Sequence, residues 1–179
     1  KEESIVVPNT GKKIFLLFGN MRKDKGHLFL ALIWKKFFNS PKDPYLWIVG
    51  NDEEKLSNQI YSYKARNIIV HNSYIPLKLI DCIYQKCDYA ILPYLSFYSG
   101  GSGPLMKGAF THSKLAIVSN VSEMGRLAKE EKLAEYFESE DQDSLVSCIK
   151  RVLNNKEDFY LEKIKRAKKY ANKRDWSNL

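Results

Sequence analysis

The stretch IFLLFGNMRKDKGHLFLALIW, Ile14–Trp34, decides the fold class of this chain. It begins with a short apolar run that ends at Gly19, passes through a polar loop, and becomes apolar again at helical spacing from His27. We therefore predict a buried strand over Lys12–Gly19 and a helix over His27–Phe38. The strand is apolar throughout rather than alternating, which is typical of a parallel sheet with helices on both faces.

The same alternation continues along the rest of the sequence. Further strands are expected at Asp43–Asp52, Asn67–Asn72, Asp88–Tyr94, Lys114–Asn120 and near Leu133–Phe137. Further helices are expected at Glu53–Tyr63, at Pro76–Gln85, from the glycine-rich segment to about Thr111, and at Glu123–Lys129, Asp141–Leu153 and Lys156–Asn172, with Ser139–Asp141 as a cap. This order predicts an α/β fold with a doubly wound, mainly parallel six-stranded sheet of the Rossmann type.

Composition is typical of a single globular domain. The 179 residues are 44% hydrophobic and 28% charged, which allows one substantial core. No apolar run approaches the roughly 18 residues of a membrane span, and the N-terminal KEESIVVPNTGKK has no signal-peptide core, so a cytoplasmic protein is expected. The three cysteines lack metal-like spacing, which favours reduced thiols.

The chain is basic, with 29 Lys and Arg against 21 Asp and Glu and a formal net charge of +8. Much of the excess lies in LEKIKRAKKYANKRDW, Leu161–Trp176. Such a segment is typical of a solvated helix face, of a surface for anionic membranes, or of a nucleic-acid partner. No signature of a nucleic-acid-binding module accompanies it, so the charge alone leaves these alternatives open.

A second glycine-bearing segment, SFYSGGSGPLMKGAF at Ser96–Phe110, follows the predicted strand Asp88–Tyr94. It lacks the Gly-Lys-Ser/Thr of a P-loop, and Met106 stands where a dinucleotide fingerprint needs its third glycine. From these residues alone, a structural turn and an anion-binding loop both remain open.

The first loop, GNMRKDKG at Gly19–Gly26, places three cations near a helix N-terminus. Their interaction with the helix dipole is unfavourable, and a bound anion would offset it. Both glycine-bearing loops follow the carboxyl ends of parallel strands, so we expect them on one rim of the sheet, where a diphosphate could lie between them.

Several segments together resemble the C-terminal, nucleotide-sugar-binding domain of GT-B glycosyltransferases of family 4. Ile14–Trp34 is similar to that family's first strand, its F-G-x-I-R-x-x-K-G loop and its first helix. The likeness continues through YLWIVGN, NIIVHNSYIPLKLIDCIYQKCDYAILPY, KGAFTHSKLAIVSNV and the terminal YANKRDWSNL, so it spans nearly the whole chain in matching order.

The resemblance implies an interdomain linker over residues 1–10, a nucleotide-sugar-binding domain over 11–155 and a crossover helix over 156–179. It implies the donor-binding half of a retaining glycosyltransferase, which transfers a hexosyl group from a nucleoside-diphosphate sugar to a polysaccharide or glycolipid. An N-terminal domain would bind the acceptor, so the isolated chain is expected to be inactive. Neither a metal or other cofactor nor a nucleic-acid partner is expected, and the inner face of an anionic membrane is a candidate partner.

The resemblance also assigns candidate site residues. Arg22 and Lys25 match the basic pair that stabilises the departing nucleoside diphosphate; in the family's commoner loop form the Arg falls at Asn20. The substrate-binding candidates are Gly19, Asn20, Tyr74, Ile75, Ser99, Gly100, Gly101, Ser102, Gly103, Pro104 and Leu105. Tyr74 and Ile75 match the loop that contacts the base, and the segment from Ser99 to Leu105 is the expected phosphate-binding loop, with backbone N–H groups from Gly101 to Leu105 as donors.

The resemblance implies a pair of glutamates separated by seven residues, but both carboxylates are missing here: the second position is Gly108 and the first falls near Gly100. The second glutamate holds the donor ribose in many members, so ribose recognition in this chain is expected to differ. The Ser-Gly-rich loop resembles a branch of the family without this motif. His71 and His112 are expected to be packing residues, and His27 faces either the core or the rim.

Two other functions stay open at this point. One is a nucleotide-binding module without transfer activity, which the absence of both carboxylates favours. The other is a basic domain that recruits a nucleic acid or a protein. The presence of Arg22 and Lys25 favours the transferase over both.

Overall fold

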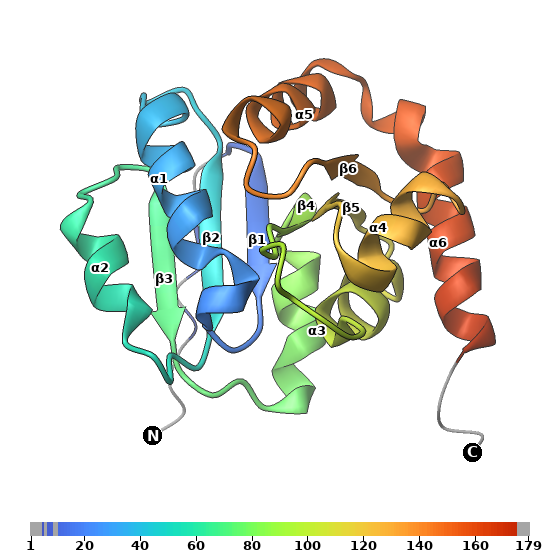
Figure 1. Cartoon of the computed structure of the whole chain (residues 1–179), viewed down its shortest axis with the longest axis horizontal. Helices are drawn as coiled ribbons and strands as arrows, with labels where there is room; N and C mark the ends of the chain where they lie inside the picture. Colours follow the sequence, from blue (N-terminus) through green and yellow to red (C-terminus); the bar gives the residue numbers. More distant parts are fainter. Residues whose placement is uncertain (1–4, 6, 9–10, 175–179) are drawn as a thin grey trace.

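Figure 1 shows the computed structural model of the chain, which describes residues 5, 7, 8 and 11–174. Six strands, all parallel, form one sheet in the order β3-β2-β1-β4-β5-β6. The strands are β1 (Ile14–Phe18), β2 (Tyr45–Gly50), β3 (Ile68–Asn72), β4 (Tyr89–Leu92), β5 (Leu115–Ser119) and β6 (Glu135–Phe137). The predicted doubly wound, six-stranded sheet is confirmed, and its strand order reverses between β1 and β4, where such sheets bind ligands.

Helices connect the strands as expected. The α-helices are α1 (His27–Phe37), α2 (Leu56–Ser62), α3 (Leu77–Gln85), α4 (Ser122–Lys129), α5 (Gln142–Asn154) and α6 (Leu161–Lys173). Shorter elements are the 3₁₀ turns η1 (Lys23–Lys25) and η3 (Glu157–Tyr160) and the π-helix η2 (Pro104–Phe110). The predicted cap of α5 is also present, because the Asp141 carboxylate accepts a hydrogen bond from the N–H of Ser144 at 2.9 Å.

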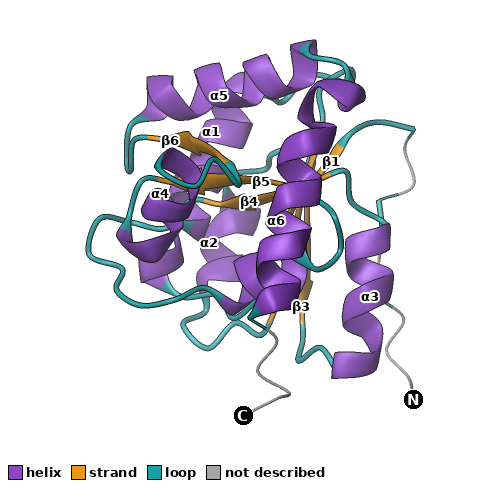
Figure 2. Ribbon diagram, turned by 90° about the vertical axis from the view of Figure 1, so that its right-hand side faces the viewer, coloured by secondary structure: helices purple, strands orange, loops and turns teal. Residues whose placement is uncertain are grey.

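The sheet is covered on both faces, as the two views in Figures 1 and 2 show. Along β1, Phe15 and Leu17 point into the core shared with α1, α2 and α5, whereas Leu16 points into the core shared with α3, η2, α4 and α6. Strand β2 divides in the same way, with Ile48 in the first core and Trp47 in the second. Period-two alternation between two apolar layers explains why these strands are apolar at every position.

The carboxyl ends of β1 and β2 approach each other closely. The N–H of Gly19 donates to the carbonyl of Val49 at 2.9 Å, and that of Met21 to Asn51 at 2.8 Å. Gly50 has a φ of +156°, and a Cβ placed on it would lie 2.1 Å from the carbonyl oxygen of Gly19. Only glycine fits at position 50, so the end of β2 helps to fix the start of the loop that follows β1.

Three elements differ from the prediction. The last helix, predicted from Lys156, begins at Leu161 after the 3₁₀ turn η3. Helix α2 begins at Leu56 rather than Glu53, because Lys55 has a positive φ of 56° and the Asp52 carboxylate caps the helix by accepting from the N–H groups of Leu56 and Ser57 at 2.8 Å. The segment after the glycine loop is a π-helix rather than an α-helix. The side chain of Tyr84 lies against this segment, the kind of insertion that widens a helical turn.

The predicted domain boundaries stay predictions. Most of the linker over residues 1–10, and the end of the crossover helix at 175–179, lie outside the described residues. Within the described part, α6 packs on the same sheet face as η2 and α4 through Ala167 and Ala171.

Candidate functional site

The loop after β1 is tied to the loop after β4. Gly26, between η1 and α1, has a φ of +70°, and a Cβ on it would lie 1.9 Å from the carbonyl oxygen of Pro93. The carbonyl of Asp24 also accepts a hydrogen bond from the N–H of Leu95 at 2.9 Å. The two loops that sequence reasoning placed on one rim are therefore in direct contact across the β1–β4 switch point.

The ammonium of Lys25 lies where these loops meet. A Cβ built on Gly19 would lie 3.4 Å from Lys25 Nζ and 3.2 Å from Pro104 Cγ, so the three residues share one small volume. Lys25 is partly buried, and burial, reinforced by the charge of Arg22, lowers its pKa. Its ammonium lies 6.0 Å from the ring centre of Tyr94 and donates no hydrogen bond to any described residue. A partly desolvated cation without a hydrogen-bonded partner favours an anionic ligand.

Arg22 differs from Lys25 because its charge is already paired. Its guanidinium is exposed and donates two hydrogen bonds to the carboxylate of Asp24, one of them from Nε at 3.1 Å. The neighbouring Lys23 is exposed, and its backbone N–H donates to Glu54. Among the described residues, neither Lys23 nor Lys25 has an ion pair to break before meeting an anion, and of these two only Lys25 is partly buried.

The glycine loop is held in place by side chains. The buried hydroxyl of Ser102 lies 3.2 Å from that of Tyr94 and accepts from the N–H of Leu105 at 3.2 Å. Carbonyl oxygens on the loop are also used, since Gly101 accepts from the hydroxyl of Tyr98 and Gly100 from that of Ser122, both at 2.9 Å. These hydrogen bonds hold the backbone of the glycine loop in one defined turn.

Fewer backbone donors are available than expected. Pro104 has no N–H, and the N–H of Leu105 is bonded to Ser102. The N–H groups of Gly101, Ser102 and Gly103 donate to no protein group within the described ranges. The expectation of donors from Gly101 to Leu105 is therefore wrong for Pro104 and Leu105 in this conformation, and three candidate donors remain.

The remaining candidates lie apart from this point of contact. Tyr74, in the loop between β3 and α3, is 75% exposed, while Ile75 packs against the core beside it. No hydrogen bond or ring contact among the described residues links Tyr74 to Lys25 or to the glycine loop. Ser99 follows Tyr98 on the exposed part of the glycine loop and has no recorded partner there.

Gly108 has a steric role that the sequence does not reveal. A Cβ on Gly108 would lie 2.1 Å from Tyr84 Oη, the hydroxyl that donates to the carbonyl of Pro104 at 3.1 Å. Tyr84 is fully buried, and burial raises its pKa well above the ordinary value, so it stays a neutral donor. At the position that the resemblance matches to a glutamate, any side chain would therefore require the ring of Tyr84 to move, and no sequence motif singles out Tyr84.

His27 faces the core rather than the rim. Its imidazole is 1% exposed, with Nδ1 3.3 Å from the carbonyl oxygen of Arg22 and Nε2 without a partner in the described structure. Burial, with a smaller contribution from the charge of Lys25, lowers the pKa of His27 to about 4. The imidazole is therefore neutral, and its Nδ1 lies against the backbone carbonyl of Arg22 in the loop Gly19–Gly26, which we call the cationic loop.

Stability is expected to fall as pH falls through the titration of His27. An unfolded histidine titrates near 6.5, so between about pH 6.5 and 4 the unfolded chain binds a proton that the folded chain excludes. From pH 7 to pH 5 this lowers the free energy of unfolding by about 2 kcal/mol, measurable by urea denaturation. A His27→Gln variant should lose that part of the pH dependence, and an unchanged pH profile in the variant would contradict the assignment.

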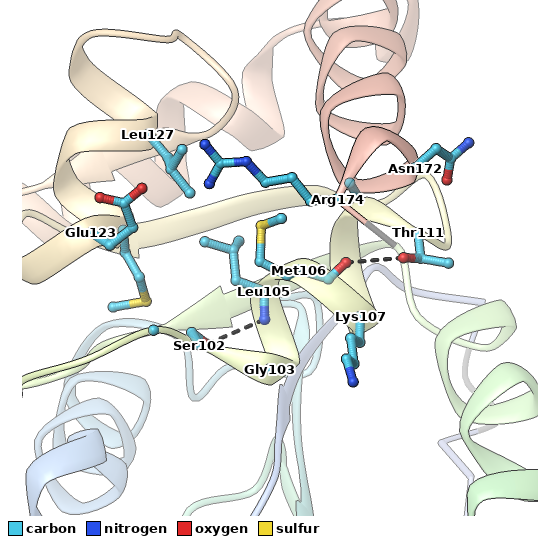
Figure 3. Close-up of a pocket in the computed structure, with 13 residues that line it drawn as sticks. Ser102, Gly103, Leu105, Met106, Lys107, Thr111, Glu123, Leu127, Asn172 and Arg174 are labelled. Carbon is cyan, nitrogen blue, oxygen red and sulfur yellow. Dashed lines mark hydrogen bonds between the residues drawn. The ribbon is translucent and has the colours of Figure 1, made fainter. Parts of the chain in front are cut away.

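A cavity of about 510 Å³ is lined in part by the glycine loop (Figure 3). It lies between η2, α4 and the end of α6, with Leu105, Met106 and Leu127 as its apolar wall and Glu123 and Arg174 at its edge. Gly101, Ser102 and Gly103 line this cavity, whereas Gly19 and Lys25 do not, so the cavity borders the candidate backbone donors but not the ammonium of Lys25. Among the described residues, no group of three His, Cys, Asp or Glu side chains has the arrangement of a metal site.

Comparison with known proteins gives one family and one fold. The family model described as glycosyl transferases group 1 matches residues 1–174. No curated protein sequence matches the chain. Similar solved structures include sucrose-phosphate synthase from Thermosynechococcus elongatus, with 15% identity and a TM-score of 0.74 over 92% of this chain.

Two further structures are similar to the chain. HepE from Anabaena, solved in complex with UDP and glucose, has 13% identity and a TM-score of 0.74 over 91% of this chain. The C-terminal domain of the group 1 family protein LpcC from Francisella tularensis has 13% identity and a TM-score of 0.72 over 94%. The chain spans 87% of that domain but only 41% of the sucrose-phosphate synthase and 44% of HepE.

Proposed function

The chain belongs to the glycosyl transferases group 1 family, and from this premise we propose that it binds the nucleoside-diphosphate sugar donor of a two-domain glycosyltransferase. One observation carries the proposal. The ammonium of Lys25 and the ring of Pro104 both lie close to Gly19, where the loops that follow β1 and β4 are in contact. An ammonium without a hydrogen-bonded partner in the described structure and free N–H groups at Gly101–Gly103 are the groups a diphosphate needs.

The proposed chemistry is electrostatic. When the glycosidic bond to the donor breaks, negative charge develops on the departing nucleoside diphosphate, and a fixed cation stabilises it most in the transition state. Lys25 supplies that cation from a partly buried position, where the interaction is stronger than in water. Arg22 adds a second positive charge that must first be released from, or shared with, Asp24.

The acceptor side of the reaction is assigned to another domain. The sucrose-phosphate synthase and HepE chains are each more than twice as long as this chain, which leaves room in them for a second domain. We propose that this second domain binds a polysaccharide or glycolipid acceptor and that the isolated chain does not turn over. Retention of configuration and hexosyl transfer are part of the proposal and rest on the likeness to family 4 enzymes.

The proposal is tested by calorimetric titration of the chain with UDP, GDP and ADP, beside uridine, guanosine and adenosine. One nucleoside diphosphate is expected to bind with a dissociation constant in the micromolar to millimolar range, and its nucleoside without phosphates at least about 10-fold more weakly. A folded chain that binds none of the diphosphates would overturn the proposed donor site.

Association with an anionic membrane and a cytoplasmic location stay predictions. No helix within the described ranges has the length and apolar character to cross a bilayer. Exposed cations line α6, namely Lys165, Arg166, Lys168 and Lys169. Clustered cations of this kind are attracted to anionic lipid headgroups, with a strength that falls as salt is raised.

A further inference from the structure

The carboxylates near the cationic loop have different partners. Asp24 is paired with Arg22, Asp52 caps α2, and Glu54 accepts from the N–H of Lys23. Each of these three therefore has a structural task that accounts for its position.

Glu53 has no such task. Its Oε1 accepts from the side-chain amides of Asn20 at 3.1 Å and Asn51 at 3.4 Å. Its Oε2 accepts no hydrogen bond from any residue that the structure describes, and no described cation lies within ion-pair distance of it. Two neutral amides thus hold one carboxylate oxygen, while the other remains open to solvent.

The position of Glu53 connects it with the proposed donor site. Asn20 follows Gly19 directly, and Gly19 lies against the ammonium of Lys25. The charge of Glu53 also acts on Lys25, since it raises the pKa of that ammonium against the larger lowering by burial. The carboxylate is therefore beside the expected phosphates, at the end of β2 next to the end of β1.

We propose that Glu53 is the residue that binds the ribose hydroxyls of the donor nucleotide, an inference that rests on the proposed function. A carboxylate repels phosphate but accepts hydrogen bonds from a vicinal diol, so the part of the ligand it fits is the sugar of the nucleoside. In doubly wound folds an acidic residue beyond the second strand commonly binds a ribose hydroxyl in this way. The site takes a ribonucleoside diphosphate in preference to a deoxyribonucleoside diphosphate.

The test compares Glu53→Gln with Glu54→Gln, which removes the same charge one residue away. Each variant is titrated with the nucleoside diphosphate that binds the unmodified chain, with its 2′-deoxy and 3′-deoxy forms, and with inorganic pyrophosphate. Glu53→Gln is expected to weaken the ribonucleotide about 10-fold, because a hydrogen bond to a charged group is lost. Pyrophosphate should bind equally well or more tightly, because a repulsive charge is removed.

The deoxynucleotide titrations and the Glu54→Gln variant show whether Glu53 recognises the ribose or affects binding only through its negative charge. At least one deoxynucleotide should bind the unmodified chain more weakly than the ribonucleotide and should be insensitive to Glu53→Gln. Glu54→Gln should leave the ratio of nucleotide to pyrophosphate affinity unchanged. Both side chains are exposed, so the urea midpoints of the variants should match that of the unmodified chain.

Failure of this inference is distinguishable from failure of the proposed function. If the unmodified chain binds no nucleoside diphosphate, the donor site itself is overturned. If it binds one, but Glu53→Gln leaves its affinity unchanged or alters nucleotide and pyrophosphate affinities alike, only the role of Glu53 is overturned.

Discussion

Replacing Gly26 by alanine is expected to lower the free energy of unfolding by about 3 kcal/mol, because backbone strain and a steric overlap add together. Alanine at a φ of +70° is strained by about 1 kcal/mol. The added Cβ would also lie 1.9 Å from the carbonyl oxygen of Pro93, a backbone atom that can move only with the loop after β4. Overpacking against fixed atoms costs about 1–3 kcal/mol more.

Gly101→Ala is the matched control for this variant. Gly101 lies on the same rim but outside the left-handed region, and a Cβ there would meet nothing within 4 Å. We expect it to change the free energy of unfolding by less than about 1 kcal/mol in urea denaturation. Equal destabilisation by the two substitutions would show that the contact between Gly26 and Pro93 does not hold the loops together.

Replacing Lys25 by methionine is expected to weaken binding of the nucleoside diphosphate about 10- to 100-fold. The ammonium is partly desolvated and has no hydrogen-bonded partner in the described structure, so its interaction with a phosphate is stronger than that of a surface lysine. Methionine keeps much of the length and apolar character of the side chain, so the loss can be attributed to the charge. Calorimetric titration measures the difference.

Two substitutions in the same loop serve as comparisons. Lys23→Met removes the same charge from an exposed position and is expected to change affinity less than about 3-fold. Arg22→Met should fall between the two, because Asp24 already holds the guanidinium. If all three variants weakened binding equally, net charge rather than the position of Lys25 would govern affinity.

The fold could be predicted because its strands are apolar at every position. A run such as Ile14–Phe18 needs two apolar surroundings, and only a sheet with helices on both faces provides them. The two glycine-bearing loops could be placed on one rim for the same reason, since parallel strands bring their carboxyl ends together. Both inferences depend on backbone periodicity, which a sequence displays directly.

The state of the individual side chains could not be predicted in the same way. Arg22 and Lys25 look equivalent in the sequence, but Asp24 pairs with one and leaves the other available. The hydrogen bond from Leu105 to Ser102 removes an expected backbone donor, and the burial of His27 depends on packing against the loop rather than on any motif. Each of these outcomes depends on contacts that form only after the chain has folded.

The contact between Tyr84 and Gly108 links the changes that this sequence can accept at the two positions. A methyl group at position 108 would overlap both the hydroxyl oxygen and the Cζ of Tyr84, at 2.1 and 2.4 Å, so even phenylalanine at 84 leaves no room. A glutamate at 108 therefore requires either a shift of the ring of Tyr84 or a smaller residue at position 84. Substitutions at positions 84 and 108 are therefore expected to be coupled, with effects on the free energy of unfolding that do not add.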